Sequence, residues 1–193
     1  MCGNKILVID AITDLHLIDW STISTNRNLK IEFELLPDFH LHFESGNIQK
    51  ALENSKDILT KRISDFDPDL LIVHSKGVCI ISFLIVENIY CGPAILLSPI
   101  INYCDHILID DVDQYWDSIQ QILASTGSKY AFGIGNSIDE RELIYNDICD
   151  MCLGKDWLIL LCDGDHDWIL DEKCWPSIGI LIDALIEPDK HTK

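Results

Sequence analysis

Short runs of consecutive apolar residues alternate along the chain with longer segments in which apolar residues recur at helical spacing. Residues 70–73, 94–97 and 158–161 are apolar at every position. Strands that are covered by helices on both faces have this pattern, which is typical of parallel sheets. The alternation of such runs with amphipathic segments therefore predicts repeated βα units.

Six strands and five helices follow from this pattern. The predicted strands are residues 5–10, 29–35, 69–74, 93–97, 129–133 and 157–162, and the predicted helices are residues 47–64, 77–89, 114–124, 139–152 and 175–186. Asp113 is expected to cap the third of these helices. Right-handed crossovers then give an α/β fold, a three-layer αβα sandwich around a mostly parallel six-stranded sheet. Because no repeat or Pro/Gly-rich linker interrupts the pattern, we predict one domain over residues 1–193.

Charge and apolar content narrow the classes of function. The chain has 32 acidic and 14 basic residues and a net charge of −18, which disfavours nucleic acid and anionic membranes as partners. No apolar stretch approaches the roughly 20 residues of a membrane span, and the N-terminus lacks the pattern of a signal peptide. The cysteines, among them Cys79, Cys104, Cys149 and Cys162, lie in apolar segments, as expected of buried reduced thiols. We therefore predict a cytoplasmic protein, and the sequence leaves its oligomeric state open.

Three residues with catalytic potential follow three of the predicted strands. Ser75 follows the third strand, Asp139 lies in the loop after the fifth, and His166 follows the sixth. Because parallel strands end at one edge of the sheet, these residues are expected to converge in the order Ser, Asp, His. Separately, each has an ordinary interpretation: Ser75 and Asp139 as helix caps, and His166 as a surface histidine. Three coincidences in one order favour a catalytic triad.

In these segments the sequence resembles the α/β-hydrolase superfamily, in particular its small lidless serine esterases and the dienelactone-hydrolase-like group. The similar segments are residues 70–77, residues 94–99, the loop that ends at Asp139, and residues 164–168. The resemblance implies Ser75 as nucleophile, His166 as general base and acid, and Asp139 as the residue that orients His166. It further implies an oxyanion site formed by the backbone N–H groups of Lys76 and Ile12. The implied activity is cofactor-independent hydrolysis of a small carboxylic ester or thioester.

The chain departs from the family pattern in three places. Val73 stands where the G-x-S-x-G motif has its first glycine, and Asp10-Ala11 replaces the usual His-Gly after the first strand. The chain also begins at what would be the family's third strand, which gives a minimal version of the fold. Val73 predicts a slightly splayed turn or an inactive one. The alternative function is therefore a hydrolase-fold protein that has lost catalysis and acts as a binding or scaffold module.

Other motifs in the sequence lack the full pattern of a metal or nucleotide site. His40-x-His42 would share one face of a strand but has no third ligand, and Cys149-x-x-Cys152 has no second pair. The D-x-D-x-D spacing at residues 163–167 lacks the glycine and glutamate of a calcium loop. With no G-x-G-x-x-G or Walker motif either, we expect no cofactor and no metal.

Substrate size follows from a short connection. The segment of residues 99–112 is too short for a lipase-type helical lid, so we expect an open site for a small molecule. Ser98 begins this connection, which is expected to run past the site and to contribute to the substrate wall.

Overall fold

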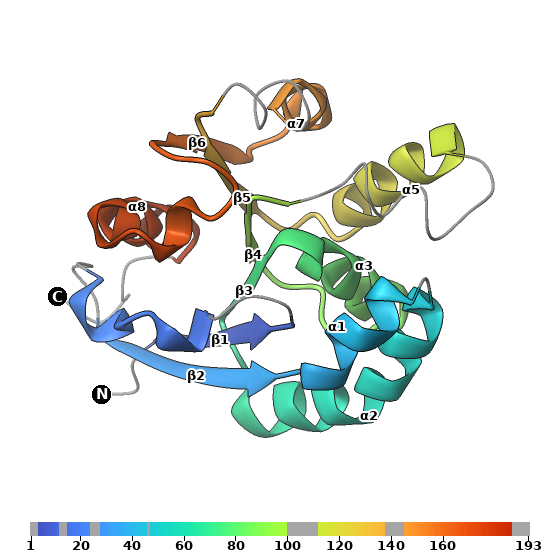
Figure 1. Ribbon diagram of the computed structural model, residues 1–193. Coiled ribbons are helices and arrows are strands. Elements are labelled where there is room, and N and C mark those ends of the chain that lie inside the picture. Colours follow the sequence, from blue (N-terminus) through green and yellow to red (C-terminus); the bar gives the residue numbers. More distant parts are fainter. Residues whose placement is uncertain are drawn as a thin grey trace, which may run out of the picture.

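The structure is a computed structural model that describes residues 4–11, 15–23, 28–45, 47–99, 112–137 and 145–186. These residues form an α/β fold around one six-stranded sheet in which every pairing is parallel (Figure 1). The strand order is β2-β1-β3-β4-β5-β6. The strands are β1 (Asn4–Asp10), β2 (Leu29–Leu35), β3 (Leu70–His74), β4 (Ala94–Leu97), β5 (Tyr130–Gly135) and β6 (Leu158–Cys162). All six predicted strands are confirmed, each within two residues of its predicted bounds.

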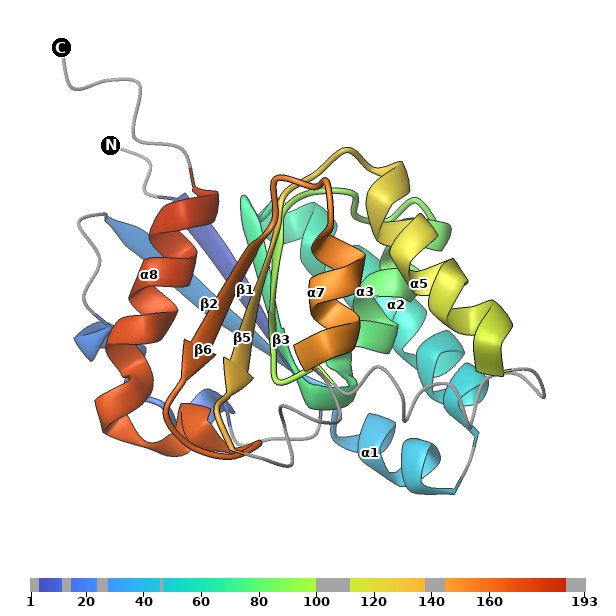
Figure 2. The same cartoon turned by 90° about the horizontal axis from the view of Figure 1, so that it is seen from above.

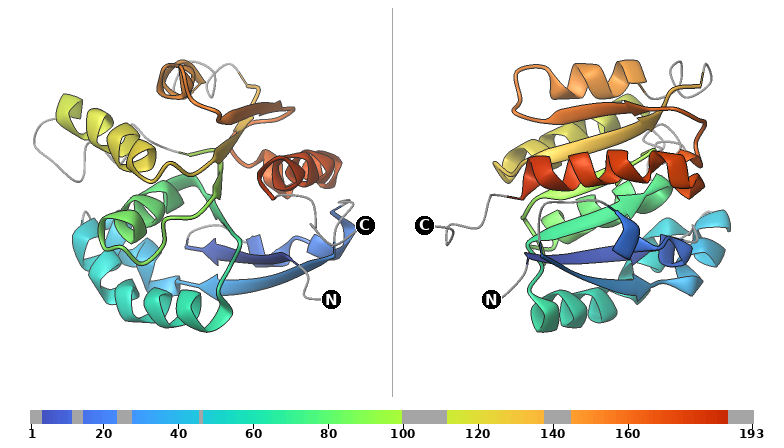
Figure 3. Two further views of the ribbon diagram at one scale, coloured as in Figure 1. Left: turned by 180° about the vertical axis from the view of Figure 1, so that it is seen from behind. Right: turned by 90° about the vertical axis from the view of Figure 1, so that its left-hand side faces the viewer.

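Helices cover both faces of the sheet, which confirms the three-layer prediction (Figures 2 and 3). On one face lie α2 (Ile48–Phe66), α3 (Val78–Val86), α5 (Val112–Ser125) and α7 (Asn146–Cys152). The other face is covered by α8 (Trp175–Leu185) and by the short 3-10 turns η1 (Leu15–Leu17) and η2 (Trp20–Thr22). Each strand contributes side chains to both helical layers, because successive side chains point to opposite faces of the sheet.

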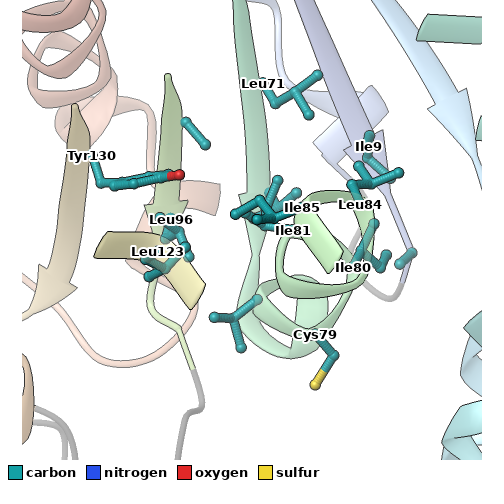
Figure 4. Close-up of a cluster of buried hydrophobic side chains, with 14 of the residues drawn as sticks. Ile9, Leu71, Cys79, Ile80, Ile81, Leu84, Ile85, Leu96, Leu123 and Tyr130 are labelled. Carbon is teal, nitrogen blue, oxygen red and sulfur yellow. The ribbon is translucent and has the colours of Figure 1, made fainter. Parts of the chain in front are cut away.

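Two apolar cores result from this alternation. Leu7, Ile9 and Leu71 pack with α3 in one core, and their neighbours Val8 and Ile72 belong to the other. Figure 4 shows Ile9 of β1 close to Leu84 of α3, and Leu96 of β4 close to Leu123 of α5, all in the first core. Central strands that are buried on both faces need apolar residues at every position, which explains the uninterrupted runs in the sequence.

The strand register brings the carboxyl ends together. Ile9 pairs with Val73 between β1 and β3, and His74 pairs with Leu97 between β3 and β4. On the far side, Gly135 at the end of β5 pairs with Cys162 at the end of β6. The loops that leave β1, β3, β4, β5 and β6 therefore start from one edge of the sheet.

Two local predictions are wrong. An additional helix, α1 (Pro37–Glu44), follows β2, so the backbone of His40 and His42 is helical and residues two apart do not share a face. Phe39 of this helix is buried in the core. A single apolar residue in the sequence does not predict such a tertiary contact. Helix α5 begins at Val112, which places Asp113 inside its first turn, where the helix dipole favours an acidic residue. Of the predicted helix at 139–152, the described part is α7, and residues 139–144 lie outside the described ranges.

Among the described cysteines, one differs from expectation. Cys79 is disulfide-bonded, so the prediction of a reduced thiol there is wrong. Cys91, Cys149, Cys152, Cys162 and Cys174 are free thiols. Within the described part of the chain, no helix has the length and apolar character that a bilayer crossing requires.

Candidate active site

Ser75 lies in the tight turn between β3 and α3. The strand ends at His74, and the 3-10 turn η3 (Ser75–Gly77) leads directly into α3. Ser75 is buried and has a φ of 54°, in the left-handed region that costs a non-glycine residue about 1–2 kcal/mol. Strained strand-to-helix turns of this kind present the nucleophile of α/β-hydrolases, and strain at a polar residue is a feature of functional sites.

Gly77 explains how the turn forms with Val73 in place of a glycine. A Cβ built on Gly77 would lie 2.7 Å from the Cβ of Val73, closer than side-chain atoms can approach. The close approach of strand and helix is thus made by the valine side chain packing against a bare glycine backbone. Val73 does not prevent the left-handed conformation at Ser75.

His166 reaches Ser75 from the loop that follows β6. Its Nε2 lies 2.9 Å from the Ser75 Oγ, across 91 positions of sequence. His166 is partly exposed, whereas Ser75 is buried. The structure therefore brings together two of the three predicted triad residues at hydrogen-bonding distance.

The loop that carries His166 is held against the end of β5. A Cβ on Gly135 would lie 2.2 Å from the backbone oxygen of Asp165, so only glycine permits this contact. The backbone N–H groups of Asn136 and Ser137 donate to the carbonyls of Cys162 and Gly164 at 2.8 and 2.9 Å. These contacts fix the backbone of the loop just before His166.

Ser98 supports the same loop from beneath. It is fully buried at the end of β4, and its Oγ accepts a 3.0 Å hydrogen bond from the Nε1–H of buried Trp168. The hydroxyl after β4 satisfies an indole that would otherwise be buried without an acceptor. The connection that Ser98 begins stays a predicted substrate wall, because its residues 100–111 lie outside the described ranges.

His74, the residue before Ser75, also contacts His166. Its Nε2–H donates to the backbone carbonyl of His166 at 3.2 Å, and the ring centroids are 5.0 Å apart. Burial, aided by the neighbouring His166, lowers the pKa of His74 to about 4. His74 is therefore neutral at physiological pH and holds the backbone of His166 in place.

Three of the predicted site residues need separate mention. Asp139 and Ile12 lie outside the described ranges. Lys76 directly follows Ser75 in η3, which places its backbone N–H in the first turn of a helical segment. Its role as an oxyanion donor stays a prediction.

At the end of β1, the buried carboxylate of Asp10 pairs with the exposed imidazole of His16. Asp10 is buried at the end of β1, and its Oδ2 lies 2.7 Å from the Nδ1 of His16 and accepts the backbone N–H of His16 at 3.1 Å. Sequence reasoning noted only the loss of His-Gly and missed His16. Asp10 and His16 are six residues apart and joined by a loop, so no helix or strand periodicity in the sequence predicts their contact.

The described residues contain one group with metal-ligand geometry at this edge of the sheet. His74, His166 and Asp167 each offer one ligand atom, and these atoms lie within 4.8 Å of one another.

In the Cys149-x-x-Cys152 pair the thiol of Cys152 is not activated, because burial raises its pKa to about 12. A protonated thiol is a poor nucleophile and a poor metal ligand.

Comparison of the chain with models of known protein families finds no match. Comparison with curated proteins finds no significant relative.

Proposed function

We propose that the chain is a serine hydrolase that cleaves a small carboxylic ester or thioester, with Ser75, His166 and Asp139 as the catalytic triad. The observation that carries the proposal is the 2.9 Å contact between the Ser75 Oγ and the His166 Nε2, made by a serine in a left-handed turn between a strand and a helix. A helix-capping serine needs neither the positive φ nor the imidazole. The α/β-hydrolase resemblance of the sequence points to the same pair.

Asp139 is proposed as the acid from the course of the chain. The N–H of Ser137 donates to the carbonyl of Gly164, two residues before His166. Asp139 follows Ser137 by two residues, a stretch that spans at most about 7 Å. We therefore propose that this acid accepts a hydrogen bond from the Nδ1 of His166, the nitrogen that must carry a proton if Nε2 is to act as the base.

In the proposed mechanism, His166 accepts a proton in each step and returns it to the group that leaves. The hydroxyl of Ser75 donates its proton to Nε2 while Oγ attacks the carbonyl carbon, and the N–H of Lys76 donates to the oxygen that becomes negative. The imidazolium then gives the proton to the leaving alkoxide or thiolate, which leaves an acyl group on Ser75. A water molecule attacks this acyl group, gives a proton to His166, and the carboxylic acid departs as Ser75 recovers its proton.

The charge around His166 limits the substrate. Asp163, Asp165 and Asp167 flank it and are exposed, in a chain of net charge −18. A negative potential lowers the local concentration of anions and raises that of cations. The substrate proposed here is therefore a neutral or cationic ester rather than a phosphorylated or polyanionic one.

A fluorophosphonate probe tests the proposal, because it reacts covalently with activated serines. The folded wild-type chain should be labelled at Ser75, and Ser75→Ala should abolish the labelling. Ser128→Ala is the matched control, since Ser128 precedes β5 at the opposite edge of the sheet and should leave labelling unchanged. A folded wild-type chain that takes up no label refutes the proposal and leaves the alternative, a hydrolase-fold binding or scaffold module.

A further inference from the structure

His74, His166 and Asp167 form a cluster that the triad does not fully use. Their ligand atoms lie within 4.8 Å of one another, although His74 comes from the end of β3 and the other two from the loop after β6. Two imidazoles and one carboxylate are a donor set that suits zinc and related divalent transition metals. Sequence reasoning did not combine these residues, because 92 positions separate the contacting His74 and His166.

His74 is already arranged as a metal-binding histidine is. A ligating histidine commonly donates its second ring N–H to a backbone carbonyl, which fixes the ring. The Nε2–H of His74 makes such a bond to the carbonyl of His166. The Nδ1 of His74 is buried and has no hydrogen-bond partner among the residues described, so burying this nitrogen brings no compensating hydrogen bond.

Asp167 supplies the adjustable ligand. Its backbone N–H donates to the Asp165 Oδ1 at 3.1 Å, which fixes the main chain, while its side chain is exposed. Ligands around tetrahedral zinc are about 3.4 Å apart, from bond lengths of about 2.1 Å. Because no two ligand atoms are more than 4.8 Å apart, closing the cluster requires shifts of about 1.4 Å at most, and the exposed carboxylate of Asp167 can contribute by changing its rotamer.

We propose that a divalent transition-metal ion of the zinc class binds His74, His166 and Asp167 and thereby holds the Ser75 site inactive. Neutral imidazole has one nitrogen lone pair, and the other nitrogen carries a proton. A metal on either nitrogen of His166 takes that lone pair, so His166 cannot accept the proton of Ser75. The exposed Asp163 and Asp165 beside the cluster add a potential that attracts the cation. The inhibitory half of this inference rests on the proposed function, whereas the binding half does not.

Calorimetric titration of zinc chloride into the chelator-treated full chain tests the binding half. The titrations use a Cys149→Ser/Cys152→Ser background, which removes the free thiol pair as a competing site. One equivalent of zinc should bind, and His74→Gln and Asp167→Asn should each weaken binding at least tenfold. His42→Gln removes a partly exposed imidazole of α1 as the matched control. Unchanged zinc affinity in both cluster variants overturns the site.

Labelling by the fluorophosphonate probe tests the inhibitory half. Zinc should suppress labelling of the background chain, a chelator should restore it, and labelling of Asp167→Asn should resist the same zinc concentration. Full labelling of the zinc-saturated chain overturns the inhibition. Ser75→Ala keeps every ligand and should still bind zinc. If the metal-free chain is never labelled while Ser75→Ala binds zinc, the hydrolase proposal fails and the metal site stands.

Discussion

His74 should make the folded chain sensitive to mild acid, and replacing it should remove that sensitivity. Burial lowers its pKa from an ordinary 6.5 to about 4 in the folded state. The unfolded chain therefore binds a proton near pH 6.5 that the folded chain refuses until near pH 4. Stability due to the neutral imidazole is complete above pH 6.5 and is lost as the pH falls from there toward 4.

The magnitude follows from the two pKa values. With 6.5 in the unfolded state and about 4 in the folded state, moving from pH 7 to pH 5 costs about 2 kcal/mol of unfolding free energy. For an m-value of about 2 kcal/mol per molar urea, the unfolding midpoint should fall by about 1 M through this residue. His74→Gln keeps an N–H donor for the carbonyl of His166 but does not titrate, so the variant should lack this part of the acid loss.

Urea unfolding followed by tryptophan fluorescence at pH 7 and pH 5 measures the difference. Comparing wild type with His74→Gln cancels the carboxylates that titrate in both chains. His42→Gln removes a partly exposed imidazole instead and should retain the wild-type acid sensitivity. If wild type and His74→Gln lose the same stability between the two pH values, His74 is not a buried neutral histidine and the reasoning is refuted.

The remaining predictions concern the turn, the acid, the loop and the substrate. Gly77→Ala should cost about 1–3 kcal/mol of unfolding free energy, because its Cβ would lie 2.7 Å from that of Val73; the cost should shrink in a Val73→Gly background, and equal costs in both backgrounds would contradict the contact. Asp139→Asn should cut the turnover of p-nitrophenyl acetate by about 10⁴-fold, and unchanged turnover would move the acid elsewhere. Ser98→Ala should cost about 1–3 kcal/mol in denaturant unfolding by leaving the Trp168 Nε1–H buried without its acceptor; a neutral result would mean that the indole finds another partner. Neutral or cationic acetate esters should be hydrolysed with a higher kcat/KM than a succinyl ester of the same alcohol, and a strong preference for the anionic acyl group would contradict the role of the acidic loop.

Much of the architecture is encoded locally and could therefore be predicted. Residues 70–73 and 94–97 are apolar without interruption, and only strands covered on both faces tolerate such runs. The same logic located every strand and the order in which Ser75 and His166 leave the sheet. Helix α1 escaped because its eight residues carry no extended apolar stripe, and its stability comes from packing Phe39 into the core.

The sequence by itself determined the fold class and the prediction that Ser75 and His166 meet at the carboxyl edge of the sheet. It could do so because strand periodicity and the order of the strands are properties of neighbouring residues. Only the tertiary structure decided that Val73 is compatible with the strained turn, since the space comes from Gly77 four residues later. It likewise decided that Ser98 supports Trp168, that Asp10 pairs with His16, and that His74 is buried and neutral. Each of these depends on contacts between segments that converge only when the sheet forms, and spacing along the chain carries no trace of them.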